Sequence, residues 1–173
     1  MDNNTMDVIM KTEMYLIYLQ EHVANVLSCW AEVVEKCKHM RFIYDDYVYS
    51  VLRQQIQQHD RTKLSLQEFA PYRQRFYPVD DSERAATDFQ AAWEHHKKYN
   101  SHHWENWTTQ TYTDPYSAEI NCVHMVIDWL AMGKTQDNSA LVYYEKQRDT
   151  IKLPTWADKM VREICAAVEK EGE

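Results

Sequence analysis

The sequence predicts an all-α fold, a compact single-domain bundle of six to seven helices that spans residues 1–173. Glycine occurs twice and proline four times, whereas folds with sheets use many more of both residues in their turns. Apolar residues recur at spacings of three and four along several stretches, which is typical of helices with one buried face. With 45% hydrophobic residues, the chain has enough apolar material for one core.

The first predicted helix covers about residues 6–37. Within it Leu19, Val23 and Val26 follow one another at spacings of four and three, which places them on one face. A polar connector at residues 38–45 separates this helix from a second one, whose apolar residues recur at every fourth position. Both helices are therefore expected to pack against the core.

The middle of the chain is predicted to hold shorter helices. Ser65 and Glu68 form the pattern Ser-x-x-Glu of a capping box, which predicts the start of a short helix at this point. Further along, the acidic residues Asp80 and Asp81 end a loop and predict the N-cap of a helix over about residues 82–99.

The last third of the chain begins with a polar and aromatic segment at residues 100–112 that we expect to be irregular. Asp114 and Pro115 then predict the start of a long helix, and Gly133 suits the position just after its end. Two closing helices within residues 139–170 are expected to pack on the rest of the domain.

Composition excludes several classes of function. A net charge of −8 and a pI near 5.5 argue against stable binding to nucleic acid, which needs a basic surface. Because Gly133 and Gly172 are the two glycines, a glycine-rich phosphate loop cannot form. The sequence contains no apolar run of membrane-spanning length, no secretion signal and no CxxC pair, so we expect a cytoplasmic protein with reduced thiols.

Three sets of polar residues fall on apolar faces of the predicted helices: His22, the adjacent pair His59 and Asp60, and Asp128. A buried carboxylate costs several kcal/mol unless a cation or strong donors accompany it. Imidazoles and carboxylates together suit a divalent transition metal such as Mn, Fe, Co, Ni or Zn. The sequence therefore predicts a metal site, with His59 and Asp60 at the edge of a helix and Asp60 bridging two ions.

Four histidines, His95, His96, His102 and His103, lie within nine positions and are expected to serve a second ion. His96 and His103 are seven residues apart, as are His95 and His102, so each pair would share a face of a continuous helix. We assign His96 and His103 as ligands, because His96 shares the apolar face of its helix. The choice within each adjacent pair stays open.

Ordinary structural roles are the alternative for each of these residues. His22 could be a hydrogen-bonded core histidine, Asp128 could simply orient His124 one turn away, and the histidine run could be a surface patch. The ordered series as a whole favours a metal site.

The order of these residues along the chain resembles that of the HD-domain superfamily of metal-dependent phosphohydrolases. The residues from His59 to Lys63, His-Asp-Arg-Thr-Lys, resemble the HDxxK motif of the branch that hydrolyses cyclic dinucleotides. The gap from His96 to His102 is shorter than in that branch, and its GYP element is missing, so cleavage of cyclic dinucleotides is not implied. Over about residues 15–133 the chain is closest to an uncharacterised family of small bacterial and phage HD-like proteins.

This resemblance implies metal-dependent hydrolysis of a phosphate ester or anhydride in a nucleotide-like or other small molecule. It makes Asp60 and Lys63 the catalytic residues, with Lys63 on a substrate phosphate. Arg73, His95 and His102 are the further substrate-binding candidates. The implied metal ligands are His22, His59, Asp60, His96, His103 and Asp128.

Two other functions fit the same residues. Some HD-fold proteins with six His/Asp ligands bind a diiron pair and oxidise small substrates with oxygen. A non-catalytic protein that sequesters a nucleotide is the other alternative, and the sequence also allows a homodimer.

Overall fold

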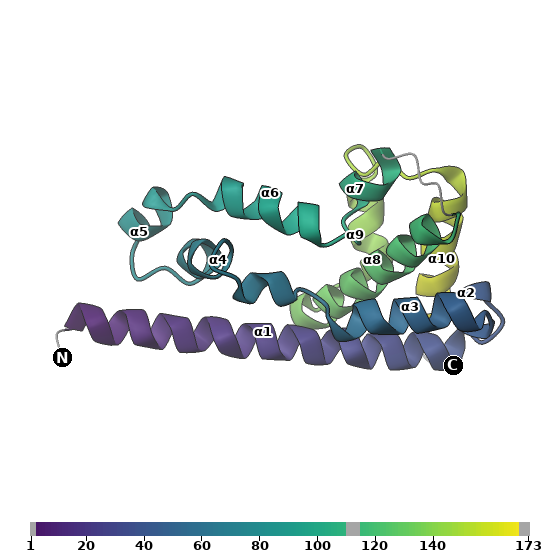
Figure 1. Cartoon of the computed structure of the whole chain (residues 1–173), viewed down its shortest axis with the longest axis horizontal. Helices are drawn as coiled ribbons and strands as arrows, with labels where there is room; N and C mark the ends of the chain where they lie inside the picture. Colours follow the sequence, from purple (N-terminus) through teal and green to yellow (C-terminus); the bar gives the residue numbers. More distant parts are fainter. Residues whose placement is uncertain (1–2, 110–114, 170–173) are drawn as a thin grey trace. The chain divides into compact units, whose positions relative to one another are not determined.

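Helices dominate the structure of this chain, which is a computed structural model (Figure 1). It describes residues 3–109 and 115–169. Among these residues the regular elements are ten α-helices and one 3-10 helix, and seven of the α-helices have at least seven residues. The prediction of an all-α fold is confirmed for the described residues. No helix in the described part of the chain combines the length and the apolar composition that crossing a bilayer requires.

Contacts between residues divide the chain into two compact units. Unit 1 consists of Met1–Val23 and Asp60–Asn100, and unit 2 of Ala24–His59 and Ser101–Glu173. The long helix α1 (Asn3–Lys36) contributes its first part to unit 1 and the remainder to unit 2. Each unit has its own apolar cluster.

Unit 1 combines the first part of α1 with four short helices: η1 (Arg61–Leu64), α4 (Phe69–Phe76), α5 (Asp81–Ala86) and α6 (Phe89–Tyr99). Helix α4 contacts α5, α6 and η1. The buried apolar residues of the unit are Tyr15, Leu19, Tyr72 and Ala92, and half-buried aromatic side chains surround them. This core is small and largely aromatic.

Of the two helix starts predicted in unit 1, one agrees with the structure. Asp80 caps α5 as expected, because its side chain accepts a hydrogen bond from the backbone N–H of Glu83 at 2.9 Å. The single helix predicted over residues 82–99 is wrong, since Asp88 caps a new helix, α6, through the N–H of Ala91. The capping box of Ser65 is also wrong: Glu68 directly precedes α4, and its side chain makes no cap hydrogen bond.

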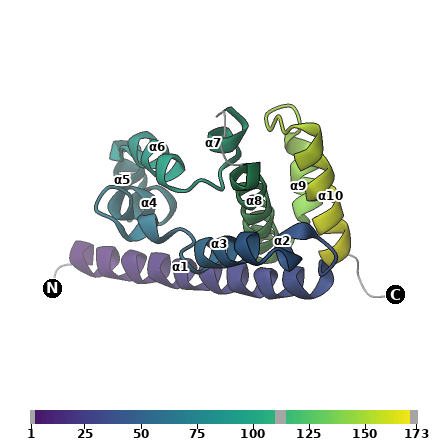
Figure 2. The ribbon, with the colours of Figure 1, turned by 45° about the vertical axis from the view of Figure 1, so that its right-hand side comes forward.

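Unit 2 is built around α8 (Pro115–Gln136), which contacts α3 (Asp46–Gln57), α7 (Trp104–Thr109), α9 (Ala140–Gln147) and α10 (Thr155–Val168). The short helix α2 (Arg41–Tyr44) packs on α3, and α9 lies beside α10 (Figure 2). Val33, Leu52, Ile127 and Ile164 belong to one continuous apolar cluster. The thiols of all four cysteines are buried and free.

Two expectations for the last third of the chain are wrong. Residues 104–109, predicted to be irregular, form α7, while the predicted cap at Asp114 lies outside the described residues. Helix α8 also continues past Gly133 to Gln136. Gly133 is needed for a close approach instead, because a β-carbon there would collide with the backbone oxygen of Asn138.

Candidate functional site

The His59–Asp60 pair follows the end of α3. This helix is capped by Asp45, whose carboxylate accepts from the N–H of Val48 at 3.1 Å, and it ends at Gln57. Asp60 has φ 55° and ψ 18°, the left-handed conformation that Asp tolerates better than most residues. The prediction that both residues lie at the edge of a helix is therefore wrong, because a left-handed turn sets their directions.

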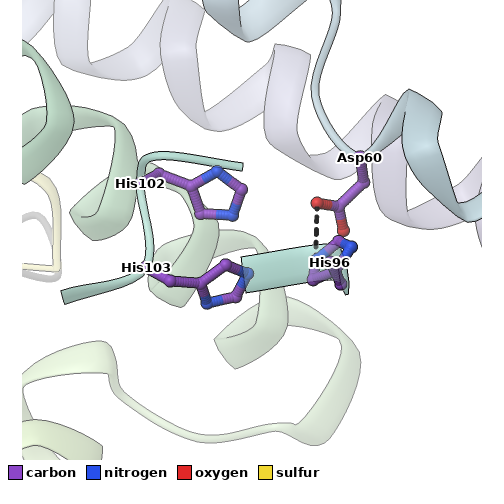
Figure 3. A group of neighbouring side chains, drawn as sticks. All are labelled: Asp60, His96, His102 and His103. Carbon is purple, nitrogen blue, oxygen red and sulfur yellow. Dashed lines mark ion pairs between the residues drawn. The ribbon is translucent and has the colours of Figure 1, made fainter. Parts of the chain in front are cut away.

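Asp60 is the centre of a buried polar cluster in unit 1. Its Oδ1 lies 3.3 Å from Nε2 of His96, the pair marked in Figure 3, and its Oδ2 lies 3.7 Å from Nε2 of His22. The Nζ of Lys63 lies 2.6 Å from the same Oδ2. All four side chains are buried, so one carboxylate meets two imidazoles and an ammonium away from water.

A second carboxylate, that of Glu68, contacts both histidines of α6. Its side chain is fully buried, and its two oxygens lie 2.8 Å from Nδ1 of His96 and 2.6 Å from Nδ1 of His95. Because an ionised carboxylate can only accept hydrogen bonds, both Nδ1 atoms carry the proton. The Nε2 of His96, which faces Asp60, is then the atom at which a metal ion can take the place of a proton.

Thr62 and Asn100 complete this network. The hydroxyl of Thr62 donates to Glu68 at 2.9 Å, and the amide of Asn100 donates to Thr62 at 2.7 Å and to the backbone oxygen of His96 at 2.8 Å. Asn100 therefore holds the last turn of α6 in place, while Thr62 saturates the oxygen that orients His96.

The charges in this cluster favour a cation near His96. Burial alone would raise the pKa of Glu68, but hydrogen bonds from His96, His95 and Thr62 outweigh burial and lower this pKa below its usual value. Burial would likewise lower the pKa of His96, but its hydrogen bonds to Asp60 and Glu68 outweigh burial and raise it. The two carboxylates thus stabilise positive charge on the imidazole, whether a proton or a metal ion supplies it.

Unit 2 has its own polar cluster, formed by His59, His102, His124 and Asp128. His59 Nδ1 lies 2.9 Å from His124 Nε2, and His59 Nε2 lies 3.4 Å from Asp128 Oδ1. The three histidines are buried and have ligand atoms within 4.8 Å of one another. His124 and Asp128 are one turn apart on α8, so the most extensively packed helix of the unit fixes both.

His102 also faces Asp128, with 3.9 Å between its Nε2 and Oδ2 of the carboxylate. The ring of His103 lies 4.4 Å from that of His102, centroid to centroid, and both are labelled in Figure 3. His103 is less buried than His102. Within unit 2, His102 is therefore the member of the pair that belongs to the cluster.

The donor atoms of both clusters fit a divalent transition metal. Two ligand atoms about 2.1 Å from one tetrahedral ion lie about 3.4 Å apart. The N···O separations of 3.3 and 3.7 Å at Asp60 and of 3.4 Å between His59 and Asp128 are close to that value. Imidazole nitrogen with carboxylate oxygen and no thiolate suits Mn, Fe, Co, Ni or Zn.

Comparison with known protein families identifies the family of this chain. The profile of one protein family, described as a family of unknown function (DUF5662), matches residues 11–170. The chain belongs to this family. No curated protein and no solved structure matches the chain. Both clusters lie inside the range of the DUF5662 match, while the resemblance to the HD-domain superfamily stays a prediction.

Nine of the residues predicted for the site lie in or beside the two clusters of this DUF5662 protein. The members in unit 1 are His22, Asp60, Lys63, His95 and His96, and those in unit 2 are His59, His102, His103 and Asp128. His95 contacts Glu68 and is partly exposed, which agrees with the preference for His96 as the ligand.

Arg73 has a different environment from the one expected of a phosphate-binding residue. Its guanidinium forms a two-pronged ion pair with Glu83, at 2.8 and 2.5 Å, and is 6% exposed as a residue. This ion pair connects α4 to α5. The carboxylate of Glu83 already occupies the pair of guanidinium N–H groups that a phosphate would need. We therefore give Arg73 a structural role.

Two residues of the clusters were missed as site residues by sequence reasoning, Glu68 and His124. Glu68 was assigned to a helix cap because the Ser-x-x-Glu pattern is also that of a capping box. The sequence suggested only that Asp128 could orient His124. In the structure, His124 contacts His59. A carboxylate shortly after an HD pair is the signal that could have identified Glu68.

Proposed function

We propose that this protein is a metal-dependent phosphohydrolase that acts on a nucleotide-like or other small phosphorylated molecule. The observation that carries the proposal is the environment of Asp60, where a buried carboxylate meets two imidazole Nε2 atoms and the ammonium of Lys63. This arrangement supports the proposal because candidate metal ligands and a cation suited to a phosphoryl oxygen lie side by side within unit 1.

His22, Asp60 and His96 would hold an ion within unit 1, and His59, His102 and Asp128 would hold an ion within unit 2. A divalent metal at such ligands supplies Lewis acidity and lowers the pKa of a coordinated water. Two ions per chain remain the prediction from the order of these residues along the chain.

Lys63 and Glu68 have distinct tasks in this proposal. The ammonium of Lys63 pairs with Asp60 and carries a positive charge that would stabilise phosphoryl oxygens as their negative charge increases. Glu68 keeps the proton of His96 on Nδ1 and so preserves Nε2 as a ligand. Both side chains are buried, which strengthens these interactions relative to water.

The test is hydrolysis of a panel of nucleoside phosphates and aryl phosphate mono- and diesters, measured as inorganic phosphate released from the nucleoside phosphates and monoesters and as aryl alcohol released from the diesters. The assay is run without oxygen and with Mn, Co, Ni or Zn, and it compares wild type with Asp60→Asn and with His39→Ala, a change at an exposed histidine. We expect turnover in wild type and His39→Ala and a loss of at least about 100-fold in Asp60→Asn, because the variant lacks the charged ligand.

Equal turnover in Asp60→Asn and wild type would contradict the proposal. Product formation that requires iron and consumes oxygen would favour the oxygenase alternative instead.

A further inference from the structure

Two buried tyrosine hydroxyls in unit 1 have no visible structural role. Tyr15 on α1 is fully buried, and Tyr72 on α4 is 5% exposed. Neither hydroxyl oxygen has a hydrogen-bond partner among the described residues. Buried polar atoms are nearly always paired in proteins, so two unpaired hydroxyls in one small core call for an explanation.

The rings of both tyrosines are well packed, and only their hydroxyls are left unexplained. Tyr15 packs against Phe69 and Tyr77, with ring centroids 5.4 and 5.9 Å apart. Tyr72 packs against Phe89 at 5.1 Å and against His96 at 5.6 Å. Phenylalanine could make these same ring contacts, so packing does not account for the hydroxyls.

The surroundings of the hydroxyls are charged. The Nζ of Lys63 lies 5.5 Å from the centre of the Tyr72 ring and pairs with Asp60. Burial raises the pKa of both tyrosines, while Lys63 acts in the opposite sense and Asp60 and Glu68 raise it further. Both hydroxyls therefore stay protonated, as donors, at neutral pH.

We propose that Tyr15, Tyr72 and Lys63 together bind a phosphoryl group through its non-bridging oxygens. The proposal rests on the proposed function and names the residues that hold its substrate. Both tyrosines belong to the buried cluster of unit 1, the Tyr72 ring contacts His96, and the ammonium of Lys63 lies near that ring and beside Asp60. The non-bridging oxygens of a phosphoryl group can accept hydrogen bonds from all three donors, whereas a metal cation has no lone pair with which to accept them.

The experiment uses the full chain as purified and inorganic phosphate as the probe, titrated by calorimetry. Tyr15→Phe and Tyr72→Phe should each weaken phosphate binding about tenfold, the usual effect of losing one hydrogen bond to a charged group, and the double variant should weaken it further. Tyr77→Phe, at a half-buried tyrosine of the same aromatic cluster, should bind phosphate as wild type does.

A thermal melt without phosphate provides the second readout. Because each substitution removes a buried hydroxyl without a hydrogen bond, Tyr15→Phe and Tyr72→Phe should melt at the wild-type temperature or above it. Lower melting temperatures with wild-type phosphate affinity would overturn the proposal and assign the hydroxyls to the fold. Absence of phosphate binding in wild type would overturn it too.

Activity assays separate this proposal from the proposed function. Weaker phosphate binding in the phenylalanine variants without any turnover in wild type would retain the pocket and reject the hydrolase. Turnover with an unchanged KM in both variants would retain the hydrolase and reject the pocket.

Discussion

The two units place the same types of ligand residue in opposite surroundings. Unit 2 fixes His124 and Asp128 on α8, a 22-residue helix most of whose apolar side chains belong to a large apolar cluster. Unit 1 has four buried apolar residues in its cluster and fixes His96 through hydrogen bonds with Glu68 and Asn100. The positions of the candidate ligands thus depend on polar contacts in unit 1 and on apolar packing in unit 2.

The largest effect is expected from Glu68→Ala in unit 1. Removing a buried carboxylate leaves two imidazoles and the Thr62 hydroxyl without their acceptor, a loss of about 3–5 kcal/mol. Urea unfolding in the presence of a chelator measures this effect without any contribution from metal.

Glu13→Ala, at an exposed position of α1, is the control for Glu68→Ala and should unfold at the wild-type urea concentration. If Glu68→Ala is as stable as wild type, the polar network does not hold unit 1 together.

A smaller effect is expected from His124→Ala in unit 2. The variant removes the partner of His59 Nδ1, at a cost of about 2 kcal/mol, while the apolar packing of α8 keeps Asp128 in place. Because His124 also orients His59, metal affinity should fall about 10- to 100-fold. Competition with a coloured chelator measures that affinity, and His39→Ala is the matched control.

A loss of stability in His124→Ala as large as that in Glu68→Ala would remove the contrast between the units. Unchanged metal affinity in His124→Ala would mean that His59 needs no positioning by this residue.

The smallest effect is expected at Asp158, which lies in unit 2 outside its polar cluster. Asp158 accepts hydrogen bonds from Tyr144 at 2.9 Å and from Arg162 at 3.2 Å. Burial would raise its pKa, but these donors outweigh burial and lower the pKa below 3.8. A lowered folded-state pKa stabilises the protein above the unfolded-state pKa, and this contribution is lost as pH falls through the folded-state pKa.

Asp158→Asn should therefore cost about 1 kcal/mol at neutral pH, and its difference from wild type should shrink below pH 3.8. Chemical unfolding of both proteins across this pH range provides the check. A difference that stays constant with pH would show that the charge of Asp158 contributes nothing.

The sequence predicted the helical fold and most candidate ligands for one physical reason. Apolar periodicity shows which side faces inward, so a polar residue on that side, such as His22 or Asp128, is noticed at once. Periodicity carries no information about where a helix is interrupted. The left-handed turn at Asp60, the new cap at Asp88 and the continuation of α8 past Gly133 depend on local backbone geometry and close contacts.

The roles of Glu68 and Arg73 were inaccessible for a related reason. Each side chain could contact a residue nearby in the sequence or a residue of another helix, and the amino-acid sequence is the same in both cases. Only the tertiary contacts direct Glu68 to His95 and His96 and pair Arg73 with Glu83.

The most direct test of the metal assignment is the metal content of untagged protein, measured by mass spectrometry. Wild type and His39→Ala should carry stoichiometric transition metal, and His59→Ala/Asp60→Ala, which removes one residue from each cluster, should lose it. Wild-type protein that carries no stoichiometric metal after purification in metal-supplemented buffer would contradict the assignment of both clusters.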